Sequence, residues 1–280
     1  MTIYQQLLDI QTSRGAGYLV LIDPDKQSPE QLADFANACE EQDADGLLVG
    51  GSLLFNDHFD RTVEAIKKAV RIPVILFPGS GRQLSRHADA VLFMSLISGR
   101  NANFLIGEQV ISAPLVRALG IEPISMGYML VESGATTAAE FMSNTRPLPR
   151  NKPEIAAAHA LAAEYLGMKS VYLEAGSGAE RSVPETLIGA VRKTVSIPIF
   201  VGGGIRKPEE ARAKAEAGAS FVVTGNVLEK SDDARLIPKG LIHKGLIHRG
   251  LIHRGLIRGF ADAVHSAAAS PQARAEERRS

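Results

Sequence analysis

Residues 197–204 read IPIFVGGG, a run of branched apolar residues that ends in three glycines. The apolar residues do not alternate with polar ones, which is typical of a strand buried on both faces, as in a parallel sheet covered by helices. Similar runs recur along the chain, at residues 18–24, 46–51, 72–79, 90–96, 121–131, 170–176 and 221–226. We therefore expect eight buried strands.

Helical patterns separate these runs, with apolar residues at three-to-four spacing in segments such as 29–42, 151–167, 183–195 and 207–218. Four prolines stand in the first turn of such segments, namely Pro29, Pro153, Pro184 and Pro208. At this position the missing N–H costs nothing, because it would have no partner within the helix. Gly167 and Gly218 follow two of the segments. Strand and helix alternate eight times, which predicts an α/β fold, a single (β/α)8 TIM barrel with parallel strands. A doubly wound open sheet is the alternative.

Composition narrows the class of partner. The chain has 280 residues, 31 of them basic and 31 acidic, so the formal net charge is zero and nothing favours nucleic acid. The single cysteine, Cys39, excludes an internal disulfide, and its place in a helical segment favours a buried, inert thiol. The first residues are no signal peptide, and no apolar stretch approaches the ~20 residues of a membrane span. We expect a cytoplasmic protein with a small-molecule partner and no stable membrane insertion.

Residues 241–255 depart from the pattern, because LIHKG LIHRG LIHRG has a period of five that fits neither a helix nor a strand. A glycine at every fifth position also weakens a continuous helix. We interpret residues 1–269 as the barrel domain, with the five-residue repeat inserted at 239–255 ahead of a last helix at 256–269. Residues 270–280 are interpreted as a disordered tail. The repeat could supply a metal-binding tract, although an expansion without function is favoured; its histidines are His243, His248 and His253.

Glycines end three consecutive strands in the second half of the chain, in EAGSG (174–178), GGGI (202–205) and TGN (224–226). These strands are neighbours in a barrel, so their turns converge, and backbone N–H groups there form a phosphate site without a charged side chain. Glu174 is unexpected beside such a site, since a carboxylate repels phosphate. It should contact another part of the ligand.

The first two strands end in oxygen-bearing residues. IDPDK places Asp23 at the end of the first strand, with Asp25 and Lys26 just beyond, and VGGSLL presents Ser52 at the end of the second. Oxygen ligands of this kind suit Mg²⁺, whose shell is completed by water and by phosphate oxygens of a substrate. Asp23 could equally be a helix cap or a turn residue.

Taken together, these motifs resemble the geranylgeranylglyceryl phosphate synthase family, a group of barrel prenyltransferases that includes bacterial heptaprenylglyceryl phosphate synthases. The resemblance runs from about Tyr18 to Asn226 and returns in the last helix, with IDPDK, VGGS, YLEAGSG, GGGI and GN in the family's order and spacing. SLISGRNANFLIGEQV (95–110) resembles the subgroup found in some archaea and in bacteria, whose members mostly make the geranylgeranyl product.

The resemblance implies a Mg²⁺-dependent enzyme of ether-lipid synthesis. It would join geranylgeranyl diphosphate to the C3 hydroxyl of sn-glycerol 1-phosphate, giving geranylgeranylglyceryl phosphate and diphosphate. Asp23 and Ser52 would hold Mg²⁺ against the prenyl diphosphate, while Glu174 would bind the glycerol hydroxyls and accept a proton, with Tyr172 as the second catalytic residue. The residues implied in binding glycerol phosphate are Tyr172, Leu173, Glu174, Ala175, Gly176, Ser177, Gly178, Gly203, Gly204, Gly225 and Asn226. The subgroup favours a homo-oligomer.

The polyprenyl tail needs an apolar groove. Candidates for its wall, each more readily explained as barrel core, are Phe77, Pro78, Met94, Ile97, Met126 and Tyr128.

Two other functions remain open: another barrel enzyme that acts on a small phosphorylated metabolite, and a non-catalytic protein that binds a phosphate ligand.

Overall fold

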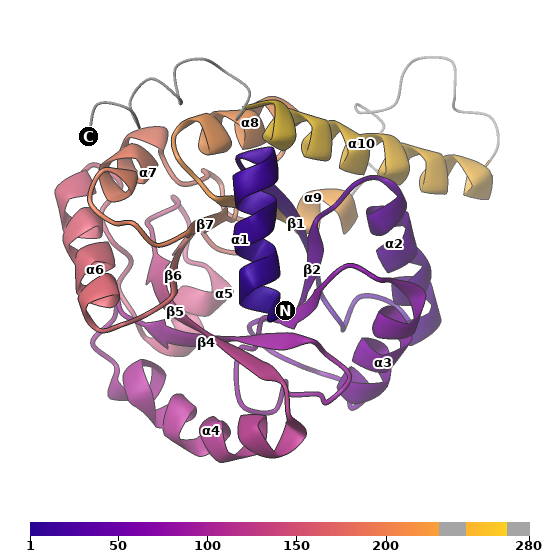
Figure 1. The fold of residues 1–280 in the computed structure, drawn as a ribbon, viewed down its shortest axis with the longest axis horizontal. Coiled ribbons are helices and arrows are strands. Elements are labelled where there is room, and N and C mark those ends of the chain that lie inside the picture. Colours follow the sequence, from indigo (N-terminus) through magenta and orange to yellow (C-terminus); the bar gives the residue numbers. More distant parts are fainter. Residues whose placement is uncertain (230–244, 268–280) are drawn as a thin grey trace.

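The eight predicted strands close into one barrel. In the computed structural model, which describes residues 1–229 and 245–267, neighbouring strands are parallel and β8 is hydrogen-bonded back to β1. The strands are β1 (Gly17–Ile22), β2 (Gly46–Val49), β3 (Val74–Leu76), β4 (Ala90–Leu96), β5 (Glu122–Leu130), β6 (Ser170–Glu174), β7 (Ile199–Gly202) and β8 (Phe221–Thr224). The predicted (β/α)8 barrel is confirmed, and the pairing of β8 with β1 rules out the open sheet (Figure 1).

Helices surround the strands (Figure 1). They are α1 (Ile3–Arg14), α2 (Pro29–Glu41), α3 (Phe59–Ala69), a π-helix η1 (Asn103–Gly107), α4 (Glu108–Leu119), α5 (Ala138–Ser143), α6 (Pro153–Tyr165), α7 (Glu185–Arg192), α8 (Pro208–Glu216), α9 (Asn226–Glu229) and α10 (Gly245–Ala267). Pro184 differs from the prediction, because its ψ of 142° keeps it outside α7 as the residue before the helix. Within the described residues, no helix combines the length and apolar character needed to cross a bilayer.

Side chains of the strands alternate between two hydrophobic layers, as the period of two requires. The inner layer fills the barrel with rings of Tyr172, Phe200 and Phe221, whose successive centroids lie 6.1 and 4.6 Å apart. The outer layer lies between strands and helices and contains Leu173 and the fully buried Cys39. Burial raises the pKa of the Cys39 thiol, which agrees with the predicted buried and unreactive cysteine.

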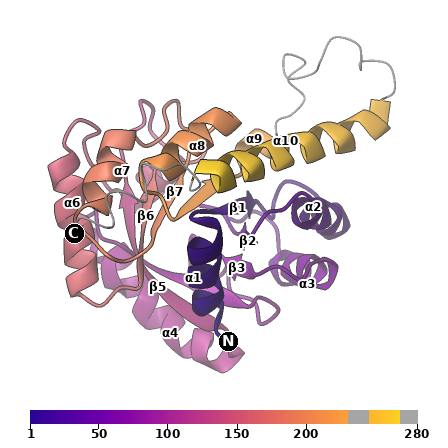
Figure 2. The ribbon, with the colours of Figure 1, turned by 45° about the horizontal axis from the view of Figure 1, so that its top comes forward.

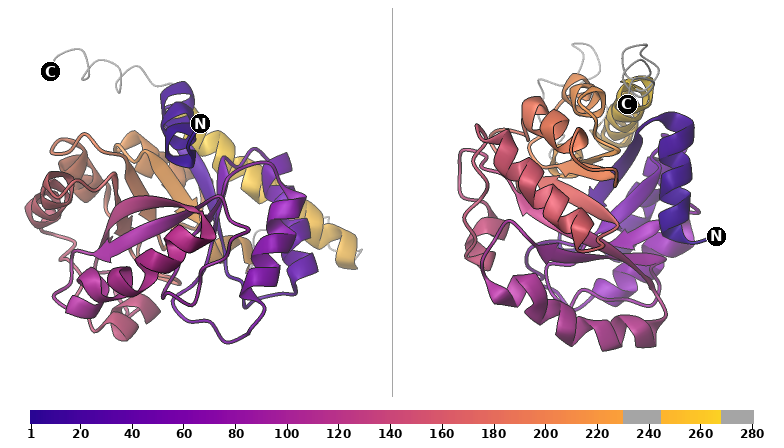
Figure 3. Two further views of the ribbon diagram at one scale, coloured as in Figure 1. Left: turned by 60° about the horizontal axis from the view of Figure 1, so that its bottom comes forward. Right: turned by 60° about the vertical axis from the view of Figure 1, so that its left-hand side comes forward.

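Helix α1, which the sequence analysis did not identify, covers one end of the barrel (Figure 3). Leu7 of this helix belongs to the inner hydrophobic layer and is 1% exposed. The carboxylate of Glu122, at the start of β5, accepts hydrogen bonds from the backbone N–H groups of Ile3 (2.5 Å) and Tyr4 (3.1 Å). A negative charge is favourable at a helix N-terminus, so α1 is fixed over the amino ends of the strands.

Helix α10 begins at Gly245, inside the five-residue repeat, and not at residue 256 as predicted. Its later turns pack on the barrel through the fully buried Ile257 and Phe260, and Phe260 stacks on Tyr18 with a centroid distance of 5.9 Å. Figure 2 shows α10 running beside α8 and past β1 toward α2. This packing offsets the helix-weakening glycines, which cost about 1 kcal/mol each. The start of the repeat, with His243, and the predicted tail at 270–280 lie outside the described residues.

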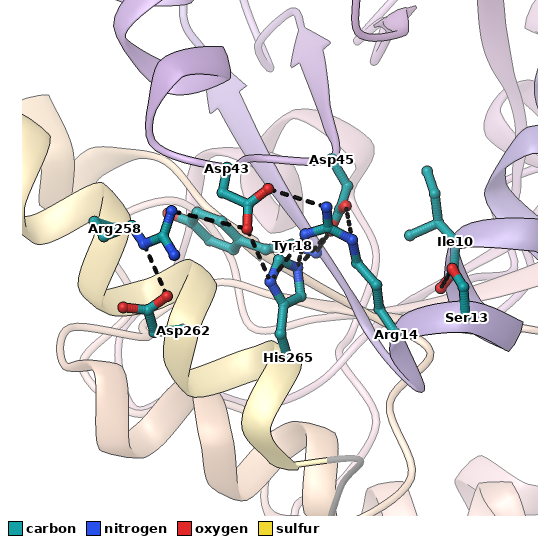
Figure 4. A network of polar contacts seen from close by, with 9 residues as sticks. All are labelled: Ile10, Ser13, Arg14, Tyr18, Asp43, Asp45, Arg258, Asp262 and His265. Atoms are coloured by element: carbon teal, nitrogen blue, oxygen red, sulfur yellow. Dashed lines mark hydrogen bonds and ion pairs between the residues drawn. The ribbon is translucent and has the colours of Figure 1, made fainter.

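A polar network joins α10 to the amino ends of β1 and β2 (Figure 4). Asp45 is 6% exposed and accepts a hydrogen bond from the N–H of Tyr18 (2.7 Å). Its carboxylate also lies 3.3 Å from Arg14 Nε and 2.8 Å from His265 Nε2. Asp43 adds an ion pair of 3.0 Å with Arg14. Asp45 thus connects α1, β1 and α10 through one buried carboxylate.

We expect Asp45→Asn to lower the free energy of unfolding by about 2 kcal/mol, because a buried acceptor of charge-assisted hydrogen bonds loses its charge. Asp262→Asn is the matched control, since this aspartate lies on α10, the helix of His265, in an exposed pair with Arg258 (2.8 Å). The control should stay within about 0.5 kcal/mol of the unsubstituted protein. Urea titrations of the two variants measure the difference, and equal stabilities would contradict the role given to Asp45.

Candidate active site

A cavity of about 530 Å³ opens at the carboxyl ends of the strands, a volume typical of small-molecule sites. One side is formed by the turns after β6, β7, β8, β1 and β2, and the other by the turn after β3, by β4 and β5, and by residues of η1, α4 and α5. Ten of the predicted site residues line this cavity, namely Asp23, Ser52, Tyr172, Glu174, Gly176, Ser177, Gly178, Gly203, Gly204 and Gly225. The barrel therefore brings together residues separated by two hundred positions.

Three predicted site residues, Leu173, Ala175 and Asn226, are not among those that line the cavity. Leu173 and Ala175 are buried in the outer hydrophobic layer, because their side chains point away from the barrel axis. The N–H of Ala175 is also used within the sheet, where it donates to the carbonyl oxygen of Gly202 (3.0 Å). Asn226 directly follows Gly225 as the first residue of α9.

The glycine turns pack too closely to admit side chains. Gly176 has a φ of 102° and Gly203 a φ of 83°, values that other residues rarely adopt. A Cβ atom on Gly203 would lie 2.3 Å from Oε1 of Glu174, and one on Gly176 would lie 2.2 Å from the Cγ2 methyl of Thr137. These turns therefore present backbone groups, and not side chains, around the carboxylate.

Glu174 is buried at the centre of this arrangement, with 5% of its surface exposed. Burial raises the pKa of its carboxyl group from 4.5 to about 7, although a hydrogen bond from the N–H of Gly176 to Oε1 (2.5 Å) opposes the rise. No cation pairs with Glu174 within the described part of the chain. A carboxylate that releases its proton near neutral pH is suited to general-base catalysis.

Tyr172 lies two residues before Glu174 on the same face of β6 and is fully buried. Its ring stacks on Phe77 with a centroid distance of 5.3 Å. Among the described residues its hydroxyl oxygen makes no hydrogen bond of normal geometry, although Glu174 lies close enough for a weak contact that affects the pKa of both groups. Burial, followed by the charge of Glu174, raises the pKa of Tyr172. A buried hydroxyl without a partner is unfavourable, so a ligand hydroxyl placed here would gain a hydrogen bond.

The ends of β1 and β2 form the adjoining part of the cavity. Oδ1 of Asp23 accepts a hydrogen bond from the N–H of Asp25 (3.0 Å), and Oδ2 lies 3.7 Å from Nζ of Lys26. Its side chain keeps 30% of its surface exposed, and Asp23 and Ser52 both line the cavity. Asp23 thus has the turn contact considered in the sequence analysis and still contributes oxygen atoms to the cavity wall.

Gln83 is a supporting residue that the sequence analysis missed. It is 1% exposed, donates from Nε2 to the carbonyl oxygen of Gly51 (2.7 Å) and accepts from the N–H of the same residue (3.1 Å). The paired hydrogen bonds fix the chain beside Ser52. No pattern in the sequence relates Gln83 to a glycine 32 positions earlier, so only the structure reveals the contact.

The opposite side of the cavity is mostly apolar, although Glu108, Gln109 and Ser112 of α4 also line it. Of the six groove candidates, four line the cavity (Phe77, Pro78, Met94 and Tyr128), and two do not (Ile97 and Met126). Met126 is fully buried in the inner hydrophobic layer, and Ile97 packs against the outer one. Phe104 of η1 and Met142 of α5 also line the cavity. Phe104 lies in the connection from β4 to β5 and Met142 in the connection from β5 to β6.

The fold and the cavity define a TIM barrel with a ligand site at the carboxyl ends of its strands, combining glycine turns, a buried carboxylate and an apolar wall. The chain belongs to the PcrB family, which matches residues 8–239. This assignment confirms the resemblance drawn from the motifs, and the matched region ends where the five-residue repeat begins.

Named relatives agree with this assignment. A geranylgeranylglyceryl phosphate synthase of Chitinophaga pinensis is 44% identical over 95% of this chain and 97% of its own. The synthase of Pyrococcus furiosus is 48% identical over 76% of this chain and 85% of its own. The crystal structure of (S)-3-O-geranylgeranylglyceryl phosphate synthase from Thermoplasma acidophilum, in complex with its substrate sn-glycerol-1-phosphate, superimposes with a TM-score of 0.84 at 32% identity. That comparison covers 95% of this chain and 99% of the other.

We expect Glu174→Gln to stabilise the fold at alkaline pH. Between pH 4.5 and about 7 the folded protein retains a proton that the unfolded chain has released, so this group makes stability fall as pH rises. Removing the charge should therefore raise the free energy of unfolding at pH 8 by on the order of 3 kcal/mol. At pH 5 the gain should shrink below about 1 kcal/mol. Denaturant titrations at both pH values measure the effect, and a gain independent of pH would contradict it.

Proposed function

We propose that this protein transfers a geranylgeranyl group from geranylgeranyl diphosphate to the C3 hydroxyl of sn-glycerol 1-phosphate. The observation that carries the proposal is the cavity, in which Glu174 and the unpaired hydroxyl of Tyr172 lie among glycine turns on one side of an apolar wall. Such a cavity suits a small phosphorylated polyol beside a long hydrocarbon. The relatives are named for the product, geranylgeranylglyceryl phosphate, and the Thermoplasma acidophilum structure holds the substrate sn-glycerol-1-phosphate.

In this proposal the glycerol phosphate lies over the ends of β6, β7 and β8. Backbone N–H groups of the turns that contain Gly178, Gly203 and Gly225 would bind the phosphate, while the N–H of Gly176 donates to Glu174. Glu174 and Tyr172 would bind the glycerol hydroxyls, which lets a carboxylate stand next to a phosphate site without facing the phosphate. Each polar group of the glycerol phosphate would thereby have a hydrogen-bond partner in the buried cavity.

The position of Glu174 suits it to act as the base when the ether bond forms. The C3 oxygen of the glycerol attacks C1 of the prenyl chain, the bond from C1 to the diphosphate oxygen breaks, and the diphosphate leaves with the bonding electrons. Glu174 accepts the proton of the attacking hydroxyl. Its negative charge also stabilises the positive charge that develops on the allylic carbon. With a pKa of about 7, its ionised form increases as pH rises through neutrality, so kcat/KM should rise over the same range.

Asp23 and Ser52 fit a Mg²⁺ ion by the chemistry of their oxygen atoms. Within the described residues, no group of three or more His, Cys, Asp or Glu side chains converges, so an ion here would also depend on water and diphosphate oxygens. Mg²⁺ would neutralise the charge of the departing diphosphate. Gln83 would keep the chain at Ser52 in place through its two hydrogen bonds to Gly51.

The apolar wall would take the prenyl chain, with Phe77 and Tyr128 nearest to Tyr172 at centroid distances of 5.3 and 5.5 Å. The outer surfaces of α4 and α5 carry exposed apolar side chains, including Ile111 (71%) and Phe141 (77%). These side chains support the expected homo-oligomer, since large exposed apolar groups often lie at subunit interfaces.

The proposal is tested by incubating the protein with radiolabelled sn-glycerol 1-phosphate and geranylgeranyl diphosphate and extracting the lipid product. We expect a Mg²⁺-dependent product from the 1-phosphate, little from sn-glycerol 3-phosphate, and a drop in turnover of at least about a hundredfold in Glu174→Gln. A heptaprenyl donor assayed in parallel reports the preferred chain length. If the folded protein makes no lipid with either donor, the barrel acts on another phosphorylated ligand or only binds one.

We expect Asp23→Ala to lower activity and to raise the Mg²⁺ concentration needed for half-maximal rate, because one of the two protein oxygens is lost. Titration of the reaction rate with MgCl₂ measures the shift. Asp25→Asn serves as the control, because Asp25 is not among the residues that line the cavity. Its two oxygens accept hydrogen bonds from the N–H groups of Phe55 (2.7 Å) and Asn56 (3.2 Å), and the amide oxygen of asparagine retains one of these. An unchanged Mg²⁺ response in Asp23→Ala would place the ion elsewhere.

A further inference from the structure

The loop between β6 and α7 is held from outside by an arginine of the next loop along the barrel. Arg206, between β7 and α8, donates from Nη2 to the carbonyl oxygen of Ala179 (2.7 Å) and from Nη1 to that of Glu180 (2.9 Å). One planar guanidinium thus binds two consecutive carbonyl groups, an arrangement that depends on its fork of donors. The segment it holds begins directly after Gly178, the last of the cavity-lining glycines of this loop.

Two further cations bind the next carbonyl groups of the same segment. Arg150, in the connection between α5 and α6, donates from Nη1 to the carbonyl oxygen of Ser182 (2.9 Å). Lys214 of α8 donates from Nζ to that of Val183 (2.6 Å). Four of the five carbonyl groups of residues 179–183 therefore accept a hydrogen bond from a positively charged side chain.

The cations themselves have additional contacts. Lys214, with 3% of its side chain exposed, pairs with the carboxylate of Glu185 at 2.6 Å. Arg150 also donates to the carbonyl oxygen of Glu132 (3.0 Å). These contacts fix each cation between the loop and a neighbouring element, so the loop is connected to both of its neighbours around the barrel.

We propose that Arg206, together with Arg150 and Lys214, forms a cationic clamp that holds the β6–α7 loop in the conformation that binds the phosphate of sn-glycerol 1-phosphate. This inference rests on the proposed function, whose phosphate site includes the same loop. Arg206 lines no part of the cavity, so it is a positioning residue that acts through the backbone.

The physical reason is the flexibility of the loop itself. Gly176 and Gly178, with φ values of 102° and 73°, give the backbone more conformations than other residues would allow. Without external contacts the loop would have to lose this freedom when the ligand binds, which weakens affinity. The clamp restricts the segment immediately after these glycines before the ligand arrives. Its effect should therefore appear in the affinity for the phosphate substrate.

The test compares the steady-state kinetics of two variants. Arg206→Met removes the clamp, and Arg212→Met leaves it intact. Arg212 lies on α8 and its Nε pairs with Glu216 at 2.8 Å, an exposed contact away from the loop, so it is a matched control. For Arg206→Met we expect the KM for sn-glycerol 1-phosphate to rise roughly tenfold. The kcat and the KM for geranylgeranyl diphosphate should stay within about twofold, and Arg206→Lys, which cannot bridge both carbonyls, should be intermediate.

Three outcomes would overturn the clamp: an unchanged KM for the glycerol phosphate, an equal rise in the KM values of both substrates, or the same rise in Arg212→Met. The second and third would mean that losing any arginine here loosens the whole barrel. Arg150→Met provides an independent check, because it removes the contact to Ser182 from the other side of the loop.

Hydrogen exchange separates the clamp from the proposed reaction. Amide exchange of the peptide covering residues 176–183 should be faster in Arg206→Met than in Arg212→Met without any ligand. Millimolar inorganic phosphate should slow this exchange in the unsubstituted protein and less so in Arg206→Met. If the protein made no lipid product, these two differences would still support the clamp, and their absence would overturn it.

Discussion

Hydrogen bonds between β8 and β1 close the sheet, and this closure fixes where every turn of the barrel lies. β8 pairs with β1 from Gly17 opposite Phe221 to Val20 opposite Thr224, and the missing side chain of Gly17 makes the approach possible. A Cβ atom there would lie 2.6 Å from the ring of Phe221. Closure makes the turns after β6, β7 and β8 neighbours of those after β1 and β2, so that the polar half of the cavity is continuous.

The packing that fills the closed barrel also places the reactive groups. Rings from Phe221 through Phe200 to Tyr172 form a stack along the interior, which orients the phenol toward the carboxyl ends of the strands. Gly202 leaves room for it, since a Cβ atom there would lie 2.2 Å from the Tyr172 hydroxyl oxygen. Core packing and ligand site are therefore parts of one arrangement, and a change in ring size would disturb both.

Stability and reactivity are separated between the two ends of the barrel. At the amino ends, Asp45 has an ion pair with Arg14 and a hydrogen bond with His265, which stabilise its buried carboxylate. At the carboxyl ends, Glu174 has a backbone N–H and no cation among the described residues, so burial raises its pKa to about 7. The carboxylate of Asp45 stabilises the fold. The carboxylate of Glu174 makes the fold less stable when it is ionised, and the same burial gives it the basicity that proton transfer requires.

The eight strands, their parallel arrangement and the cluster of glycine turns with Glu174 could be predicted from the amino-acid sequence, because continuous apolar runs and glycines at strand ends are local patterns. The sequence also indicated the family. It did not predict α1 over the barrel end, the start of α10 within the repeat, the hydrogen bonds of Gln83 to Gly51, or the contacts of Arg206 with Ala179 and Glu180. Each depends on segments that meet only when the barrel is closed. The raised pKa of Glu174 was likewise decided by tertiary structure, since burial comes from all surrounding strands and no residue type encodes it.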